Sequence, residues 1–166
     1  MCPTNPVCLC RLELGAGSGL VGLALALCLN HSDVSSSTIH ITDGLDALLP
    51  LMQNNIFLNT ANIGSGTHVH PALLSWGEPL DSGIPEHPDV LLAADCCYLE
   101  ATFPLLLSTM EESIGEKTVC YLCYKRRRRA DKNMMNMVRK VFDVEEIEGR
   151  WQTERVFLYE IRKKAR

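Results

Sequence analysis

The alternation of strand-like and helix-like segments limits the fold of this chain more than any other feature of its sequence. Apolar runs of strand length fall at residues 7–14, 38–42, 68–74, 89–94 and 117–124. Helical spacing of apolar residues falls at 20–29, 45–58, 100–114 and 131–141. Strands joined by helical crossovers build a parallel sheet with helices on both faces. The pattern predicts a Rossmann-like, doubly wound α/β fold.

The last part of the chain does not alternate between strands and helices. Residues 144–147 and 155–161 are two strand-like runs with no helix between them, joined through Gly149. We expect a terminal antiparallel hairpin that completes a seven-stranded sheet and makes one edge strand run in reverse. A chain of 166 residues has the usual length of one domain, so we expect a single domain over residues 1–166.

Charge and apolar content exclude several classes of protein. Sixteen basic and twenty acidic residues give a net charge of −4, which disfavours nucleic acid as the main partner. The longest apolar run, 20–29, is too short to span a bilayer. The first ten residues contain no Lys or Arg, which argues against a secretory signal peptide. We expect a cytoplasmic protein without a membrane partner.

Eight cysteines raise the question of disulfides or zinc. The pair Cys120 and Cys123 lies in a strand-like run, where residues three apart point to opposite faces. Neither a second C-x-x-C pair nor paired histidines supply further ligands. We expect reduced thiols that pack as small apolar side chains, and no metal.

Three alternating glycines, Gly15, Gly17 and Gly19, stand between the first strand-like run and the first helical one. Ligands of α/β sheets bind beside such turns, because glycine lets the backbone approach closely and exposes amide groups at a helix N-terminus. A tight turn without a ligand is the simpler interpretation. Residues 17–22 also fit the dinucleotide pattern G-x-G-x-x-G. The motif alone leaves the ligand open.

Two acidic residues end later strand-like runs. Asp43 stands where a carboxylate can accept both hydroxyls of a ribose, although capping the next helix is an alternative role. Asp95 follows the buried run 90–94, and Tyr98 comes three residues later. A carboxylate and a phenol on one turn can converge on one substrate group. The alternative is that Asp95 caps a helix and Tyr98 only packs.

Together these segments resemble the family 16 seven-β-strand, S-adenosylmethionine-dependent protein-lysine methyltransferases, the methyltransferase-like-21 group. Residues 13–22 look like that group's motif I, and Asp43 matches its ribose-binding acid. Residues 74–77 look like the tryptophan turn beside the adenine, and residues 93–98 look like the D-x-x-Y signature. The resemblance implies a class I methyltransferase fold with S-adenosylmethionine as the cofactor.

The resemblance also implies a role for each site residue. It makes Asp95 and Tyr98 catalytic, and it assigns cofactor contacts to Glu13, Gly15, Ala16, Gly17, Gly19, Asp43, Trp76 and Ala94. In the implied reaction a neutral lysine amine attacks the sulfonium methyl group. Lysine titrates near pH 10.4, so its deprotonation at pH 7 costs about 4.6 kcal/mol. A carboxylate favours the ammonium form, so we expect Asp95 to capture and orient the amine.

The basic stretch 124–132 resembles the fungal family members that methylate translation elongation factor 1A, which makes that protein the expected substrate. Its arginines, 126–129, allow three interpretations: a solvated loop, a nuclear localisation patch, or a docking surface for an acidic protein. Family members also carry an N-terminal segment with a tryptophan that closes over the cofactor. Met1 lies only a few residues before the first strand-like run, so we expect that segment to be missing and cofactor binding to be weakened.

Three other functions remain open at this point. A nicotinamide-dependent dehydrogenase explains the glycines and Asp43 but leaves Asp95 and Tyr98 without a role. A nucleic-acid amino-methyltransferase resembles the chain at these positions but has two prolines where this sequence has Cys96 and Cys97. A non-catalytic binding module would need only the cofactor site. Another protein, such as a chaperone, is an alternative substrate.

Overall fold

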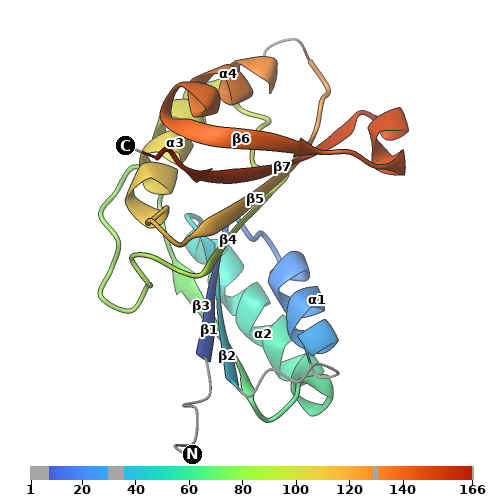
Figure 1. The fold of residues 1–166 in the computed structure, drawn as a ribbon. Helices are drawn as coiled ribbons and strands as arrows, with labels where there is room; N and C mark the ends of the chain where they lie inside the picture. Colours follow the sequence, from blue (N-terminus) through green and yellow to red (C-terminus); the bar gives the residue numbers. More distant parts are fainter. Residues whose placement is uncertain (1–7, 30–35, 129–130, 166) are drawn as a thin grey trace, which may run out of the picture.

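The apolar strand-like runs pair into one seven-stranded sheet (Figure 1). The structure, a computed structural model, describes residues 8–29, 36–128 and 131–165. The strands are β1 (Cys8–Leu14), β2 (Ser36–Asp43), β3 (Thr67–Leu73), β4 (Val90–Ala94), β5 (Val119–Lys125), β6 (Phe142–Ile147) and β7 (Val156–Lys163). Their order is β3-β2-β1-β4-β5-β7-β6. The chain runs outward from β1 to β3 and returns beside β1 as β4, which is the predicted doubly wound topology.

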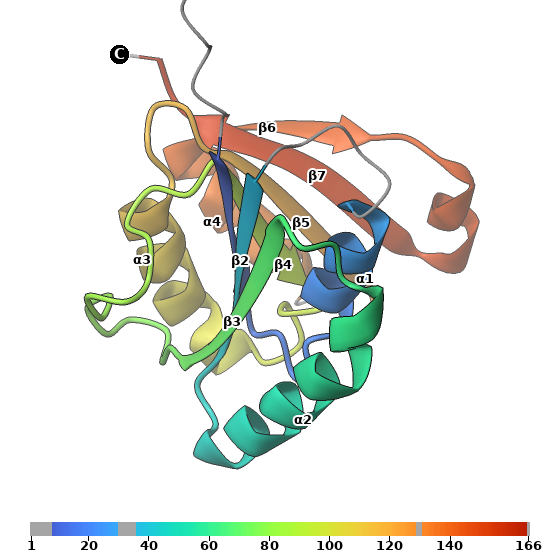
Figure 2. The ribbon, with the colours of Figure 1, turned by 90° about the horizontal axis from the view of Figure 1, so that it is seen from below.

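Helices cover both faces of the sheet (Figure 2). The α-helices are α1 (Leu20–Leu29), α2 (Leu49–Asn59), α3 (Phe103–Ser113) and α4 (Asp131–Val141). Short 3-10 helices are η1 (Asp46–Leu48), η2 (Thr60–Asn62), η3 (Glu100–Thr102) and η4 (Arg150–Glu154). One core joins α1 and α2 to β2, and a larger core joins α3 and α4 to β1, β4, β5 and β7. One face of β4 is buried and the other is half-buried, which accounts for its continuous apolar run.

The expected reversed strand exists, but its predicted position at the edge is wrong. β7 is antiparallel to both β5 and β6 and lies between them, so β6 is the edge strand. Burial explains the order, because Tyr159 and Ile161 of β7 pack in the core. β6 carries the exposed residues Asp143, Glu145 and Glu146, and charged side chains are typical of an edge.

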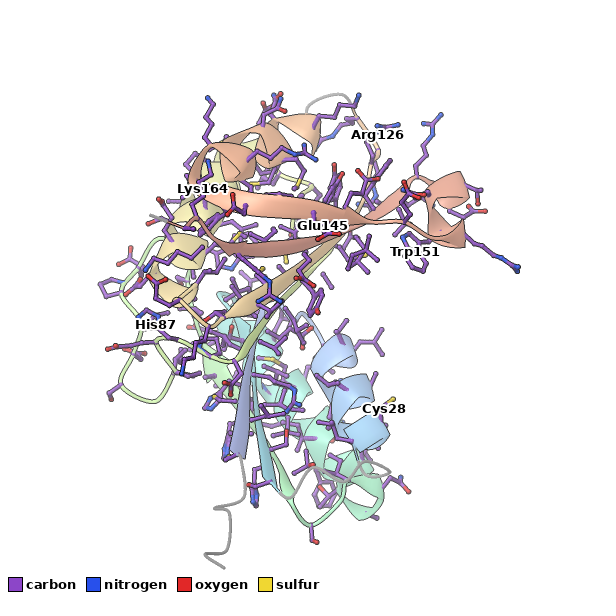
Figure 3. All side chains as sticks on the ribbon, viewed as in Figure 1. Cys28, His87, Arg126, Glu145, Trp151 and Lys164 are labelled. Carbon is purple, nitrogen blue, oxygen red and sulfur yellow. The ribbon has the colours of Figure 1, made fainter. Side chains whose placement is uncertain are left out.

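One of the connections differs from the expectation. The chain between β3 and β4 contains no helix, in agreement with the sequence pattern, and residues 74–89 form turns and coil. The hairpin between β6 and β7 contains η4, where a structure without any helix was expected. Figure 3 labels Trp151 on this hairpin, which extends beyond the end of the sheet.

The cysteines within the described ranges form no disulfides, and Cys120 and Cys123 lie on opposite faces of β5. Cys8 and Cys28 are exposed, which differs from the expected packing in the core, and Cys2 lies outside the described residues. Among the described residues, no three His, Cys, Asp or Glu side chains group as metal ligands. No helix in the described part of the chain has the length and apolar character needed to cross a membrane.

Glu13 is a buried carboxyl group that links β1 to α1. Its side chain is on the face of β1 that α1 covers, and Oε2 accepts a hydrogen bond of 2.8 Å from the Gly22 N–H. A Cβ atom at Gly22 would lie 2.7 Å from that oxygen, so glycine is required for the contact. Burial raises the pKa of Glu13 to about 7, and the Gly22 hydrogen bond opposes that shift.

We predict that Glu13→Gln stabilises the chain at neutral and alkaline pH. A carboxyl whose pKa is raised on folding stays protonated in the native state while the unfolded chain ionises, so stability falls as pH rises. The fall runs from about pH 4.5, the ordinary pKa, to about pH 7, the native pKa. At 1.36 kcal/mol per pKa unit, the difference from the glutamine variant reaches about 3 kcal/mol above pH 7.

Urea unfolding of both chains between pH 4 and pH 8.5 measures this difference. Glu145→Gln, at an exposed position of β6, is the matched control and should follow the parent at every pH. Parallel stability curves for Glu13→Gln and the parent would show that folding does not raise the pKa of Glu13.

Candidate functional site

A cavity of about 370 Å³ opens at the carboxyl ends of β1, β2 and β4. The strand order reverses between β1 and β4, and ligands of open α/β sheets bind at such a point. Its volume lies within the range of small-molecule sites. The lining residues are Gly15, Asp43, Gly44, Leu45, Leu74, Ser75, Trp76, Asp95, Cys96, Tyr98, Thr102 and Leu105.

Gly15 and Trp76 form one wall of the cavity. Gly15 has φ +61°, and a Cβ atom there would lie 2.8 Å from Cζ2 of Trp76 and 3.0 Å from Sγ of Cys96. The tryptophan turn is tied to its neighbours, because the Leu74 N–H donates to the Asp43 carbonyl at 2.9 Å. The Gly77 N–H donates to Oγ1 of Thr109 at 2.9 Å. The missing side chain at position 15 therefore lets the indole ring pack against the glycine loop.

Asp43 ties the glycine loop to the loop after β2. Its Oδ2 accepts a 3.0 Å hydrogen bond from the Gly17 N–H, and its Oδ1 accepts one of 3.1 Å from the Leu45 N–H. Asp43 does not cap the next helix, which was its alternative role. The residue that precedes α2 is Leu48, and neither α2 nor η1 has a side-chain cap. Asp43 lines the cavity, and its carboxylate retains lone pairs for two ligand hydroxyls.

Asp95 has a backbone conformation that few side chains adopt. Its φ is +56°, and its N–H donates to the Cys123 carbonyl of β5 at 2.7 Å. Among non-glycine residues, Asp and Asn tolerate this region best, and such strain gathers at functional sites. Thr102 precedes α3 and Leu99 precedes η3, neither with a side-chain cap, so Asp95 does not cap the next helix.

The Asp95 carboxylate is paired with an arginine of the loop after β5. Nη1 and Nη2 of Arg127 donate to its two oxygens, each at 2.7 Å. These hydrogen bonds lower the pKa of Asp95 below its ordinary value, although partial burial opposes the shift. The carboxylate is therefore ionised at neutral pH and faces a fixed positive charge.

Tyr98 lines the cavity with 59% of its surface exposed, so it does not merely pack in the core. Its carbonyl accepts a hydrogen bond from the Arg128 guanidinium. Arg126, labelled in Figure 3, lies 4.9 Å above the centre of the Phe157 ring. The described part of the arginine run, residues 126–128, is thus a loop beside the mouth of the cavity, as expected, while Arg129 lies outside the described residues.

The cavity brings together half of the predicted site residues, namely Gly15, Asp43, Trp76, Asp95 and Tyr98. The others, Glu13, Ala16, Gly17, Gly19 and Ala94, are not among its lining residues, and their cofactor contacts stay predictions. Ala16 and Gly19 help to shape the turn, since the Ala16 N–H donates to the Thr42 carbonyl and the Gly19 N–H to the Ala16 carbonyl, both at 2.8 Å.

Sequence reasoning missed several lining residues, above all Leu45, Cys96, Thr102 and Leu105. Cys96 stands inside the Asp95 to Tyr98 signature, so its place next to the site was a usable signal. Leu45 and Leu105 carry no such signal, because an exposed leucine differs from a core leucine only in the folded chain.

Relatives with known roles match most of the chain. Protein-lysine N-methyltransferase EFM6 of Saccharomyces cerevisiae is 38% identical over 146 residues, which cover 82% of this chain and 57% of that protein. EEF1A lysine methyltransferase 3 of Mus musculus is 38% identical over 117 residues, covering 70% of this chain and 45% of that protein. The chain therefore spans about half the length of the curated relatives it matches.

Solved structures of other proteins have the same fold as this chain. A Listeria monocytogenes structure described as a class I S-adenosylmethionine-dependent methyltransferase superposes with a TM-score of 0.66 at 11% identity. The superposition covers 95% of this chain and 54% of that one. The family model described as lysine methyltransferase matches residues 5–141. The family match over most of the chain, together with relatives 38% identical to it, shows that this chain belongs to the lysine methyltransferase family.

Proposed function

We propose that this chain is a cytoplasmic, S-adenosylmethionine-dependent protein-lysine N-methyltransferase domain, covering residues 1–166, whose substrate is translation elongation factor 1A. The observation that carries the proposal is the arrangement of one cavity. A nucleoside-binding set, Gly15, Asp43 and Trp76, and a substrate-facing pair, Asp95 and Tyr98, line the same space. Family membership supports the reaction, and the name of the mouse relative supports the substrate.

The residues of the cavity fit the proposed cofactor. An aromatic ring, a carboxylate and a close backbone suit an adenine, a ribose and the chain that joins them, and Trp76, Asp43 and Gly15 supply these features. When bound, S-adenosylmethionine supplies an electrophilic methyl group. The pairing of Asp43 with Gly17 and Leu45 holds its carboxylate in place before a ligand arrives, which reduces the entropy lost on binding.

Asp95 and Tyr98 are proposed to hold the lysine amine of the protein substrate. The Asp95 carboxylate accepts an N–H of the amine, and the Tyr98 ring limits the directions from which the amine approaches. An amine held in line for attack can gain an effective molarity worth about 7–11 kcal/mol. Leu45 and Leu105 also line the cavity and add apolar surface to it.

We predict that Asp43→Ala weakens cofactor binding and leaves the fold intact. The substitution removes the acceptor for two ribose hydroxyls and frees two backbone N–H groups, which costs about 1–3 kcal/mol of binding free energy. Calorimetry with S-adenosylmethionine measures the loss, and NAD should not bind the parent chain.

Asp46→Ala is the control for this experiment, because Asp46 is exposed in η1, three residues from Asp43 and outside the cavity lining. Its affinity should equal that of the parent. An Asp43→Ala chain that binds the cofactor as the parent does would remove Asp43 from the site, and tight binding of NAD would contradict the cofactor assignment.

We predict that Asp95→Asn keeps cofactor affinity and loses methyl transfer to elongation factor 1A by about 100-fold or more. Asparagine tolerates the left-handed backbone at this position, so the loss of charge is separated from strain. Tyr98→Phe should cost less if the ring alone shapes the pocket. The assay follows a labelled methyl group from S-adenosylmethionine into purified elongation factor 1A.

The same assay in a cell lysate tests the substrate class. Label that disappears with protease and survives nuclease supports a protein substrate. Label in nucleic acid would contradict the proposed reaction, and label in a protein other than elongation factor 1A would contradict the proposed substrate alone. Transfer by Asp95→Asn at the parent rate would contradict the role of Asp95.

A further inference from the structure

The arginine that pairs with Asp95 has a role that the proposed reaction leaves unassigned. Arg127 meets Asp95 through both Nη atoms, and both distances are 2.7 Å. The contact follows from the sheet, because Ala94 pairs with Cys123 and the two chain segments that leave β4 and β5 run side by side. The left-handed backbone of Asp95 and the short loop from Lys125 to Arg127 complete the approach.

The pair is not explained by a contribution to stability. The Arg127 side chain is 46% exposed and the Asp95 side chain 53% exposed. Exposed ion pairs contribute little to the free energy of folding. A bidentate pair nevertheless fixes the direction of a carboxylate, since a guanidinium fork matches its two oxygens. The contact therefore serves to orient the Asp95 carboxylate in the site.

The groups around Asp95 come from β5 with its loop and from the turn that contains Asp95 itself. From β5 and its loop, Arg127 and Lys125 face it with positive charge, and Lys125 adds a backbone hydrogen bond. The thiol of Cys123 also lies near Asp95. On its own turn, Tyr98 and Cys96 line the same cavity, and the buried Cys96 thiol is also near the carboxyl groups of Asp43 and Glu13. Among the described residues, the positive charges that act on Asp95 therefore come from β5 and the loop after it.

An unpaired carboxylate at this place would oppose the proposed reaction. The amine must be neutral to attack, whereas a negative charge beside it stabilises the ammonium form and raises its pKa. A neutralised carboxylate avoids this conflict. The Asp95 carboxylate accepts from Arg127 at both oxygens and from the backbone of Lys125, which leaves one lone pair that can still accept an N–H from an amine.

We propose that Arg127 is a positioning residue that neutralises Asp95, so that the carboxylate orients the substrate amine without holding it as an ammonium ion. This inference rests on the proposed lysine methylation. The ammonium loses one proton to solvent water, and the neutral amine that remains has the lone pair that attacks. Arg127 acts through Asp95 and does not itself contact the substrate.

The test compares Arg127→Gln with Arg126→Gln and Arg127→Lys in methylation of elongation factor 1A between pH 6 and pH 10. Arg126→Gln removes the same charge from the same loop, but Arg126 lies over Phe157 and is not the partner of Asp95. For Arg127→Gln we expect the rise of kcat to move about one unit toward higher pH, because the unpaired carboxylate raises the pKa of the amine. Its KM should not increase, since the ammonium form binds an unpaired carboxylate well.

Arg127→Lys should restore most of the parent profile, because it returns the charge without the fork, and Arg126→Gln should follow the parent. A second measurement needs no substrate: NMR titration of the Asp95 carboxyl should give a higher pKa in Arg127→Gln than in the parent and no change in Arg126→Gln. Calorimetry should give the same affinity for S-adenosylmethionine in all four chains.

Three results would overturn the inference. A loss of kcat that is equal at every pH, a rise of KM alone, or an unchanged Asp95 titration in Arg127→Gln would each show that Arg127 does not neutralise Asp95 for the reaction. Failure of the proposed function would give a different result. The parent chain would then transfer no label to elongation factor 1A at any pH, and the inference would fail as well. An active parent with an unshifted Arg127→Gln profile overturns the inference alone.

Discussion

The parallel pairing of β1 with both β2 and β4 is the constraint on which the rest of the site depends. Leu14 pairs with Thr42 on one side and with Ala93 on the other, so these three strands end at nearly the same level. The next residues of each strand are then neighbours in space although they are distant in the sequence. Backbone hydrogen bonding in the buried centre of the sheet thus fixes where the glycine loop, Asp43 and Asp95 meet.

Asp43 then joins three loops through one residue. Its carboxylate accepts from Gly17 and Leu45, and its carbonyl accepts from Leu74 in the tryptophan turn. The nucleoside side of the cavity is therefore assembled from backbone contacts that do not require a ligand. The opposite side has a different construction, since the partly exposed Asp95 carboxylate is held by the Arg127 guanidinium and by a backbone hydrogen bond from Lys125. If the proposed function holds, this difference in construction corresponds to the division between an invariant cofactor and a protein substrate that approaches from solvent.

Much of this arrangement was predictable from the sequence, because it follows from local patterns. Three local patterns each indicate a strand end at which ligands bind: the glycines after β1, the acid at the end of β2 and the signature after β4. The place of β7 was not predictable in the same way, since the hairpin pattern does not say which of its two strands joins β5. The pairing of Arg127 with Asp95 also depends on the adjacency of β4 and β5. The spacing of residues along the chain does not show which side chains two adjacent strands bring together.

The most direct test of the central claim is a crystal structure of the chain with S-adenosylhomocysteine, the product of the proposed reaction. We expect adenine against Trp76, both ribose hydroxyls on the Asp43 carboxylate, and the sulfur facing Asp95 with its Arg127 partner still in place. Nucleoside density elsewhere on the sheet, or a sulfur directed away from Asp95, would contradict the assignment of this cavity as the methyl-transfer site.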